Sequence, residues 1–195
     1  MPNSSDTPTT IYISAAPGLA AERDALARTI AELPVTLAWR IFQTPAATET
    51  LDREAVQTAD LHLLVMGADI RAPVGLEWDN ARRAGRPSVA FLKQSVVRTP
   101  AGQVFVNQAG VEWHRFIDAA DLGRQVQRLL AGHLLRHATH YALTLTEVEQ
   151  LEALRAIEAG QEAEELAAGE GADSSAVILS RERFVPREGV IVDDR

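Results

Sequence analysis

The chain has 195 residues, of which 46% are hydrophobic and 24% charged, which suits one globular domain with an appendage. It contains no cysteine, which excludes disulfides and thiolate chemistry, and no apolar run approaches the roughly 20 residues of a membrane helix. The net charge of -8 arises in residues 144–175, which hold nine acids and one base. The remainder is neutral and shows no basic face, which argues against nucleic acid as the main partner.

The first half of the chain alternates between strand and helix patterns. Residues 1–8 are polar and are expected to form a disordered leader without the basic start of a secretory signal, so we expect a cytoplasmic protein. The predicted elements are a strand over 9–14, a helix over 19–33, a strand over 35–42, a helix over 44–58 and a buried strand over 61–67. Thr44 is predicted as the cap of the second helix, with Pro45 at its first position.

The alternation continues in the second half. We predict a short helix over 75–84, a buried strand over 87–93, a loop over 94–112 with a minor strand at 103–106, and a strand over 113–117. A long helix capped by Asp118 or Asp121 is expected to reach His140. A further Ala-, Leu- and Glu-rich helix is expected over 143–168, followed by short strands at 176–179 and 189–192.

This order favours an α/β fold with helices on both faces of a parallel sheet. We predict a flavodoxin-like, five-stranded sheet of order 2-1-3-4-5 over residues 9–140, with its site between strands one and three. Residues 141–195 are predicted to be a helical and short β appendage that serves as an assembly or linker element. Through its helix the chain is expected to form a homo-oligomer or to contact a fused or partner domain.

The segment with the clearest chemical content follows the third predicted strand. It places Glu77 in the first turn of a helix, where the helix dipole stabilises a carboxylate, beside the crevice that binds ligands in open α/β sheets. Ala81 lies on the same helix face and is small enough to let the helix approach the sheet. Residue physics alone leaves two interpretations equally open: a functional acid, or a favourable first-turn acid.

Several short motifs occur together in a recognisable order. They are Ile11-Tyr-Ile-Ser14, the helix segment 21–26 with its Glu22-Arg23 pair, Ala59-Asp60, Glu77-Trp78-Asp-Asn-Ala81 and Gly85-Arg-Pro87. Together they resemble the TIR-like family known as domain of unknown function 4062. The Glu-x-x-x-Ala and Gly-Arg-Pro pieces also resemble nucleoside 2-deoxyribosyltransferases and, more loosely, catalytic TIR domains. The resemblance spans residues 9–93, and Ala15 stands where that family has a second serine.

This resemblance implies N-glycosidic chemistry on a nucleotide or nucleoside, with Glu77 as the catalytic carboxylate that stabilises a sugar cation. The implied protein is an NAD nucleosidase in bacterial defence or signalling, with NAD as substrate and with no cofactor or metal. Two alternatives stay open: a non-catalytic interaction or nucleotide-sensing module, and a deoxyribosyltransferase-like enzyme. The candidate ligand-binding residues are Ser14, Gly67, Asp69, Trp78 and Arg82.

Two other clusters are interpreted mainly as structural. His133, His137 and His140 share a helix face, a spacing that can bind a metal, but the apolar residues of the same stripe favour packing. Arg82, Arg83 and Arg86 could meet phosphates, although a solvated helix face is the simpler interpretation.

Overall fold

The computed structural model describes residues 8–45 and 50–157. The expected leader up to residue 7, the end of the acidic helix and the strands expected at 176–179 and 189–192 lie outside the described residues. The described residues all belong to one compact unit.

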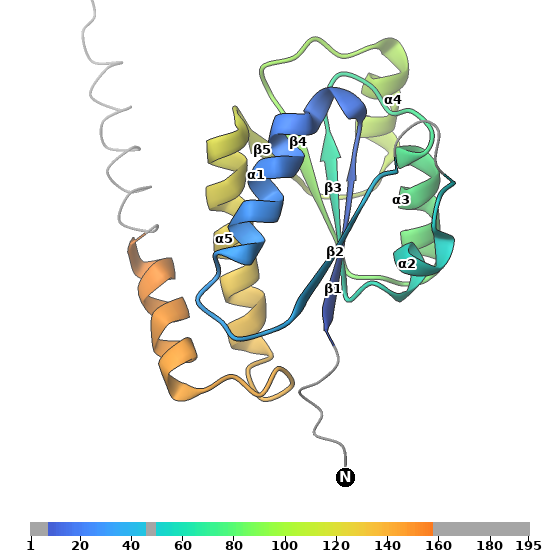
Figure 1. The fold of residues 1–195 in the computed structure, drawn as a ribbon. Coiled ribbons are helices and arrows are strands. Elements are labelled where there is room, and N and C mark those ends of the chain that lie inside the picture. The colour runs from blue at the N-terminus through green and yellow to red at the C-terminus, as the bar shows by residue number, and fades with distance from the viewer. Residues whose placement is uncertain (1–7, 46–49, 158–195) are drawn as a thin grey trace, which may run out of the picture. The chain divides into compact units, whose positions relative to one another are not determined.

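Five parallel strands form the centre of this unit. They are β1 (Thr9–Ala15), β2 (Trp39–Gln43), β3 (Leu61–Met66), β4 (Ser88–Lys93) and β5 (Trp113–Phe116). Their order is β2-β1-β3-β4-β5, which confirms the predicted flavodoxin-like topology (Figure 1). Because the connection after β1 leads toward one edge of the sheet and the connection after β3 leads toward the other, the carboxyl ends of β1 and β3 form the topological switch point where such folds bind ligands.

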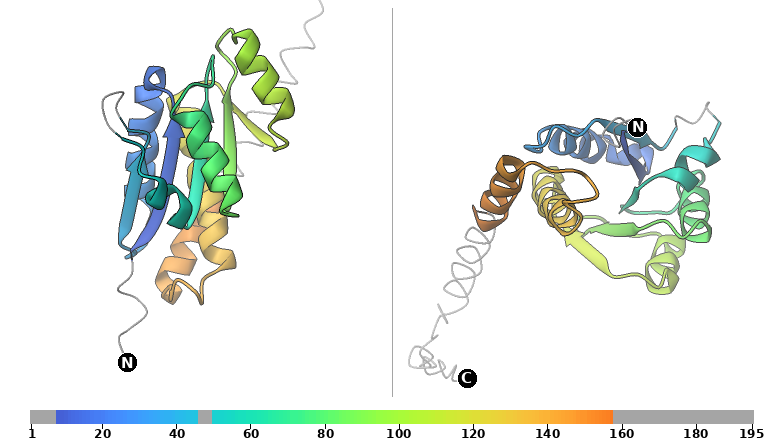
Figure 2. Two further views of the ribbon diagram at one scale, coloured as in Figure 1. Left: turned by 90° about the vertical axis from the view of Figure 1, so that its right-hand side faces the viewer. Right: turned by 90° about the horizontal axis from the view of Figure 1, so that it is seen from below.

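Helices cover both faces of the sheet. One face carries α1 (Ala20–Ala31), preceded by the 3-10 turn η2 (Pro17–Leu19), and α5 (Ala119–Arg136). The other carries α2 (Arg53–Thr58), α3 (Val74–Arg83) and α4 (Pro100–Gln108). The view from below in Figure 2 shows the two helical layers on opposite sides of the sheet.

The alternation of side chains along β1 connects these two layers. Ile11 and Ile13 are buried in the main core with residues of α1 and α5, while Tyr12 packs with residues of α2 and α3. Ser14, two positions after Tyr12, shares the α3 face because strand side chains alternate. Tyr12 and Ser14 therefore both point toward the α2–α3 layer.

The helix predicted over 44–58 begins later than expected. Helix α2 starts at Arg53, and the side chain of Asp52 caps it by accepting from the backbone N–H of Ala55 at 3.0 Å. The prediction that Thr44 caps a helix is wrong. Its hydroxyl instead accepts from the backbone N–H of Ala15 at 3.0 Å, which ties the end of β2 to the end of β1.

The stretch predicted as loop and minor strand at 103–106 is the helix α4. Thr99 caps it by accepting from the N–H of Gly102, and Pro100 occupies the first turn. The prediction missed this Thr-Pro start signal because the apolar residues at 104–106 were interpreted as a strand. Helix α5, capped by Asp118, ends at Arg136 rather than at His140.

Helix α4 packs tightly on the loop after β3. A Cβ atom at Gly102 would lie 2.6 Å from the carbonyl oxygen of Ala68, closer than any real contact of this kind. Gly75 in α3 is a matched helical position, because a Cβ there would meet only a side-chain carbon of Ile70 at 3.7 Å.

We therefore expect Gly102→Ala to lower the free energy of unfolding by about 1–2 kcal/mol, since a backbone carbonyl must shift to accept the methyl group. Gly75→Ala should be neutral or should gain up to about 1 kcal/mol from its higher helix propensity. Urea unfolding of both variants measures the difference. Equal free energies of unfolding would show that the close approach of α4 to Ala68 does not affect stability.

The start of the expected acidic helix packs on the α/β core. Residues 145–157 are helical, and Leu151 is fully buried in the main core cluster. The Glu147 carboxylate accepts from the backbone N–H and hydroxyl of both Thr36 and Thr144, at 2.6–2.8 Å. This clamp fastens the helix to the loop between α1 and β2.

Candidate functional site

Glu77 lies on the buried face of α3. That face consists of Val74, Glu77, Trp78 and Ala81, a helical spacing that directs all four side chains toward the sheet. Glu77 occupies the first turn, as predicted, and its exposure is 0%. The carboxylate is therefore held inside the protein next to the switch point, not on an open surface.

Hydroxyl groups surround this carboxylate. Tyr12 donates to Oε1 at 3.0 Å and Thr44 donates to Oε2 at 2.8 Å. The Ser14 side chain also lowers the pKa of Glu77 through hydrogen bonding. Among residues 8–45 and 50–157, no lysine or arginine pairs with this acid.

Burial and hydrogen bonding act on the Glu77 charge in opposite directions. Burial raises the pKa of the Glu77 carboxyl, and the bonds from Ser14, Thr44 and Tyr12 partly offset that rise. The pKa of Tyr12 is raised as well, first by burial and then by the neighbouring Glu77 charge, so the phenol remains a donor. The result is a buried acid stabilised by neutral dipoles instead of a counter-ion.

A histidine extends this network into β3. His62 is 0% exposed, and its Nε2 lies 2.8 Å from Ser14 Oγ. Its ring packs between Tyr12 and Trp78, with centroid distances of 6.1 and 6.0 Å. Burial lowers the pKa of His62 to about 4, so the ring is neutral near pH 7.

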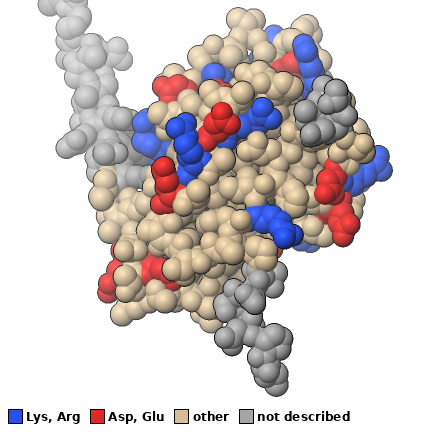
Figure 3. All heavy atoms as spheres, viewed as in Figure 1, with Lys and Arg blue, Asp and Glu red and all other residues tan. Residues whose placement is uncertain are grey.

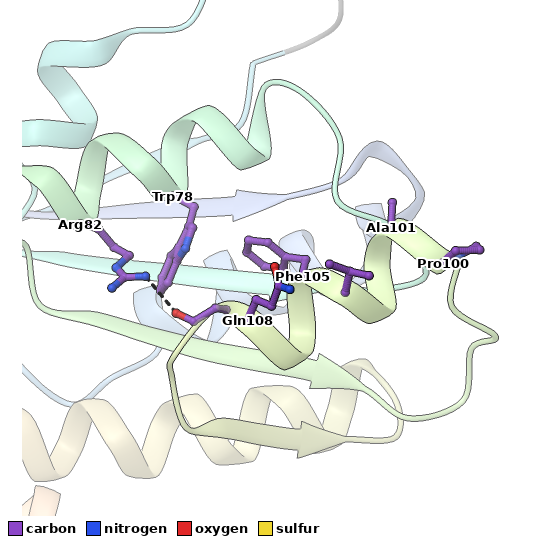
Figure 4. A pocket seen from close by; sticks show the side chains of 8 residues that line it. Trp78, Arg82, Pro100, Ala101, Phe105 and Gln108 are labelled. Atoms are coloured by element: carbon purple, nitrogen blue, oxygen red, sulfur yellow. Dashed lines mark hydrogen bonds between the residues drawn. The ribbon is translucent and has the colours of Figure 1, made fainter.

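Trp78, which packs on His62, also lines a groove between α3 and α4 together with Arg82, which lies outside the network. The groove has a volume of about 560 Å³ and is lined by Trp78, Arg82, Pro100, Ala101, Val104, Phe105, Gln108 and Ala109. Figure 4 shows the Arg82 side chain beside the Trp78 ring. The guanidinium carbon lies 5.6 Å from that ring's centroid, and a terminal nitrogen donates to the carbonyl of Ala109 at 2.9 Å.

The other two predicted pocket residues have local partners. Asp69 accepts from the Thr99 hydroxyl at 2.7 Å and from the Arg71 guanidinium at 3.1 Å, and the pKa of Asp69 is lowered chiefly by the bond from Thr99. Gly67 packs under Leu19, whose Cδ2 would lie 3.3 Å from an added Cβ. Of the predicted site residues, the structure thus brings together Glu77 and Ser14 but not Gly67, Asp69 or Arg82.

The arginine and histidine clusters also have internal partners. Arg83 pairs with Asp79 at 3.0 Å, and Arg86 donates to the carbonyl of Ala84. His133 bonds the Tyr141 hydroxyl at 3.0 Å, and burial is the main cause of its lowered pKa. Within the described ranges, no group of three or more potential ligands is arranged to hold a metal.

Sequence reasoning missed Tyr12, Thr44 and His62. The signal for Tyr12 was its position two residues before Ser14, which places both on one face of β1. His62 stood out as the one polar residue in the apolar run of β3. Thr44 was assigned to a helix cap, although it directly follows β2, whose carboxyl end lies beside that of β1.

The surface of the described unit gives few further indications of a partner. On the face seen in Figure 3, acidic and basic side chains are interspersed among uncharged residues. No helix within the described residues combines the length and hydropathy needed to cross a bilayer.

Comparison with known proteins supports no family assignment. No protein-family model and no curated protein sequence matches the chain. Among solved structures, it is similar to a crystal structure of the RPS4 and RRS1 TIR domain heterodimer, with a TM-score of 0.45 and 9% sequence identity. That match covers 62% of this chain and 94% of the other. At this level of similarity the fold assignment depends on the observed strand order, and the resemblance to the 4062 family stays a prediction.

Proposed function

We propose that this protein is a TIR-like nucleotide N-glycosidase, with NAD as its first candidate substrate and Glu77 as the catalytic carboxylate. The observation that supports this most is a buried acid at the switch point with three hydroxyl donors and, among the described residues, no cation. Buried charges in proteins are normally paired, and unpaired ones gather at functional sites. A sugar cation would supply the missing positive charge.

The proposed chemistry needs only one acid. The bond between the ribose C1′ and the nicotinamide nitrogen breaks, and nicotinamide leaves as a neutral molecule with the bonding electron pair. Positive charge develops on the ribose, where a preplaced carboxylate stabilises it. Water then adds to C1′ and loses a proton, which gives ADP-ribose. Ordinary glycosidases use a second acid, but this leaving group needs no protonation.

A second candidate function is a non-catalytic TIR-like module that works through protein contacts. The enclosure of Glu77 favours it, because the side chain is 0% exposed and does not line the groove between α3 and α4. Catalysis requires that the side chains around Glu77 move when a nucleotide binds. Without such movement the acid is a structural hub that joins α3 to the ends of β1 and β2.

The two functions are separated by incubating the full chain with NAD and with nucleosides, at low and high protein concentration, and measuring free base by chromatography. We expect nicotinamide release by the wild type and a fall of about 10²–10³-fold or more in Glu77→Gln. Circular dichroism controls for the fold of the variant. No release at any concentration supports the non-catalytic module, and transfer of a base between nucleosides would indicate a deoxyribosyltransferase-like enzyme.

A further inference from the structure

The hydrogen bonds around Ser14 admit two arrangements. Ser14 has a single hydroxyl proton, its oxygen lies 2.8 Å from His62 Nε2, and it shares the face of β1 from which Tyr12 reaches Glu77, whose pKa Ser14 lowers through hydrogen bonding. If Ser14 donates to His62, Glu77 loses that donor. If His62 donates to Ser14, the serine proton is free to bond Glu77. The choice depends on which ring nitrogen of His62 carries hydrogen.

The other ring nitrogen decides between these arrangements. Nδ1 of His62 is buried and has no hydrogen-bond partner in the structure. A proton on Nδ1 would create a buried N–H without an acceptor, at a cost of about 1–3 kcal/mol. A proton on Nε2 leaves Nδ1 as an unoccupied acceptor and makes two good bonds possible, from His62 to Ser14 and from Ser14 to Glu77. The second arrangement is thus more stable.

We propose that His62 is a positioning residue for Glu77: its Nε2–H donates to Ser14, which directs the Ser14 hydroxyl proton onto the Glu77 carboxylate. The relay runs from β3 through β1 to α3. It keeps the carboxylate oriented and charged in an apolar setting where an ionised acid is otherwise unfavourable. Its value for catalysis rests on the proposed function, but the arrangement of protons does not.

The titratable and charged groups around this relay are few. Tyr12 from β1 contacts both the Glu77 carboxylate and the His62 ring, and Asp52, the cap of α2, acts on Tyr12 through its charge. Trp78 from α3 and Leu64 from β3 belong to the apolar cluster on the same face of the sheet. The variants below leave Asp52 and Tyr12 in place, so the effect of these two groups on the Glu77 pKa is the same in every protein compared.

The first test is the ring tautomer of His62 in the wild-type protein. Long-range ¹⁵N–¹H NMR near neutral pH should show a neutral ring with its proton on Nε2. The His62→Gln spectrum assigns the signal among the five histidines of the chain. A proton on Nδ1, or a charged ring, overturns the proposal, and this measurement needs neither activity nor a ligand.

The second test follows the Glu77 carboxyl carbon by ¹³C NMR during a pH titration. We expect a higher Glu77 pKa in Ser14→Ala and in His62→Leu, and a value near that of the wild type in His62→Gln, whose amide can donate in place of Nε2. His62→Leu should add no further rise in the Ser14→Ala background, because His62 acts through Ser14. Additive effects, or an unchanged pKa in both single variants, overturn the relay.

If the wild type releases base, the same variants test the link to catalysis. One hydrogen bond to a charged group is worth about tenfold or more. Ser14→Ala, which removes the donor to Glu77, should therefore lower kcat by about tenfold with little change in KM. His62→Leu, which leaves the Ser14 hydroxyl unheld, should lower kcat by less, and His62→Gln should recover most of that loss. If the wild type releases no base while both NMR tests succeed, the proposed function fails and the relay stands as a structural device.

Discussion

Replacing Glu77 by alanine is expected to lower the free energy of unfolding by about 3 kcal/mol, because it leaves a cavity and removes the acceptor of buried hydroxyl groups. Glutamine fills the same volume, carries no charge and still accepts hydrogen bonds. We expect Glu77→Gln to be far less destabilising than Glu77→Ala. Urea unfolding of the three proteins near neutral pH measures both differences.

The pH dependence gives an independent check on the same acid. Burial raises the pKa of Glu77 in the folded state, so the folded protein binds this proton more tightly than the unfolded chain. The favourable contribution of this proton is complete below the unfolded pKa of 4.5 and is lost as pH rises through the raised folded pKa. Glu77→Gln should therefore gain stability relative to wild type as pH rises, and a difference independent of pH would contradict a buried, weakly compensated acid.

Replacing Glu147 by alanine is expected to cost about 2–3 kcal/mol, because its carboxylate accepts bonds from Thr36 and Thr144 that neutral side chains cannot replace. The backbone bonds from Thr144 and Thr36 lower the pKa of Glu147 from 4.5 to about 2. This stability is present above pH 4.5 and is lost as pH falls toward 2.

The measurement compares wild type with Glu147→Gln by urea unfolding between neutral pH and about pH 3. The advantage of the wild type should shrink in acid. Glu149, two residues along the same helix and exposed, provides a matched control, since Glu149→Gln should change stability by less than about 0.5 kcal/mol at either pH. Equal behaviour of the two variants would mean that the clamp does not hold the helix.

The topology was predictable from the sequence because its strands are short and apolar and are separated by clear breaks. The apolar run of β3 indicated a central strand buried on both faces, and Gly85 and Pro87 marked the end of α3 and the start of the next strand. Element ends were less predictable. The Thr-Pro dipeptides at Thr44 and Thr99 look alike, yet only Thr99 caps a helix, because the hydroxyl of Thr44 is used by the end of β1 and by Glu77.

The candidate site was only partly predictable for a related reason. Helix position and periodicity indicated where Glu77 would lie, but its burial depends on side chains from β1 and from the end of β2. Single-sequence patterns do not show which side chains of separate strands meet. His62 could have been singled out as a polar residue in an apolar strand, but its bond to Ser14 requires the register between β1 and β3.

The hydrogen bond between Asp69 and Thr99 restricts how the groove between α3 and α4 can open. The Asp69 carboxylate accepts from Thr99, the cap of α4, so the loop that leads into α3 is fastened to the first turn of α4. The two walls of the groove at Trp78, α3 and α4, are thereby joined at one end by this hydrogen bond. A ligand that enters by parting α3 from α4 must either break that fastening or widen the opposite end, where Arg82 holds the carbonyl of Ala109.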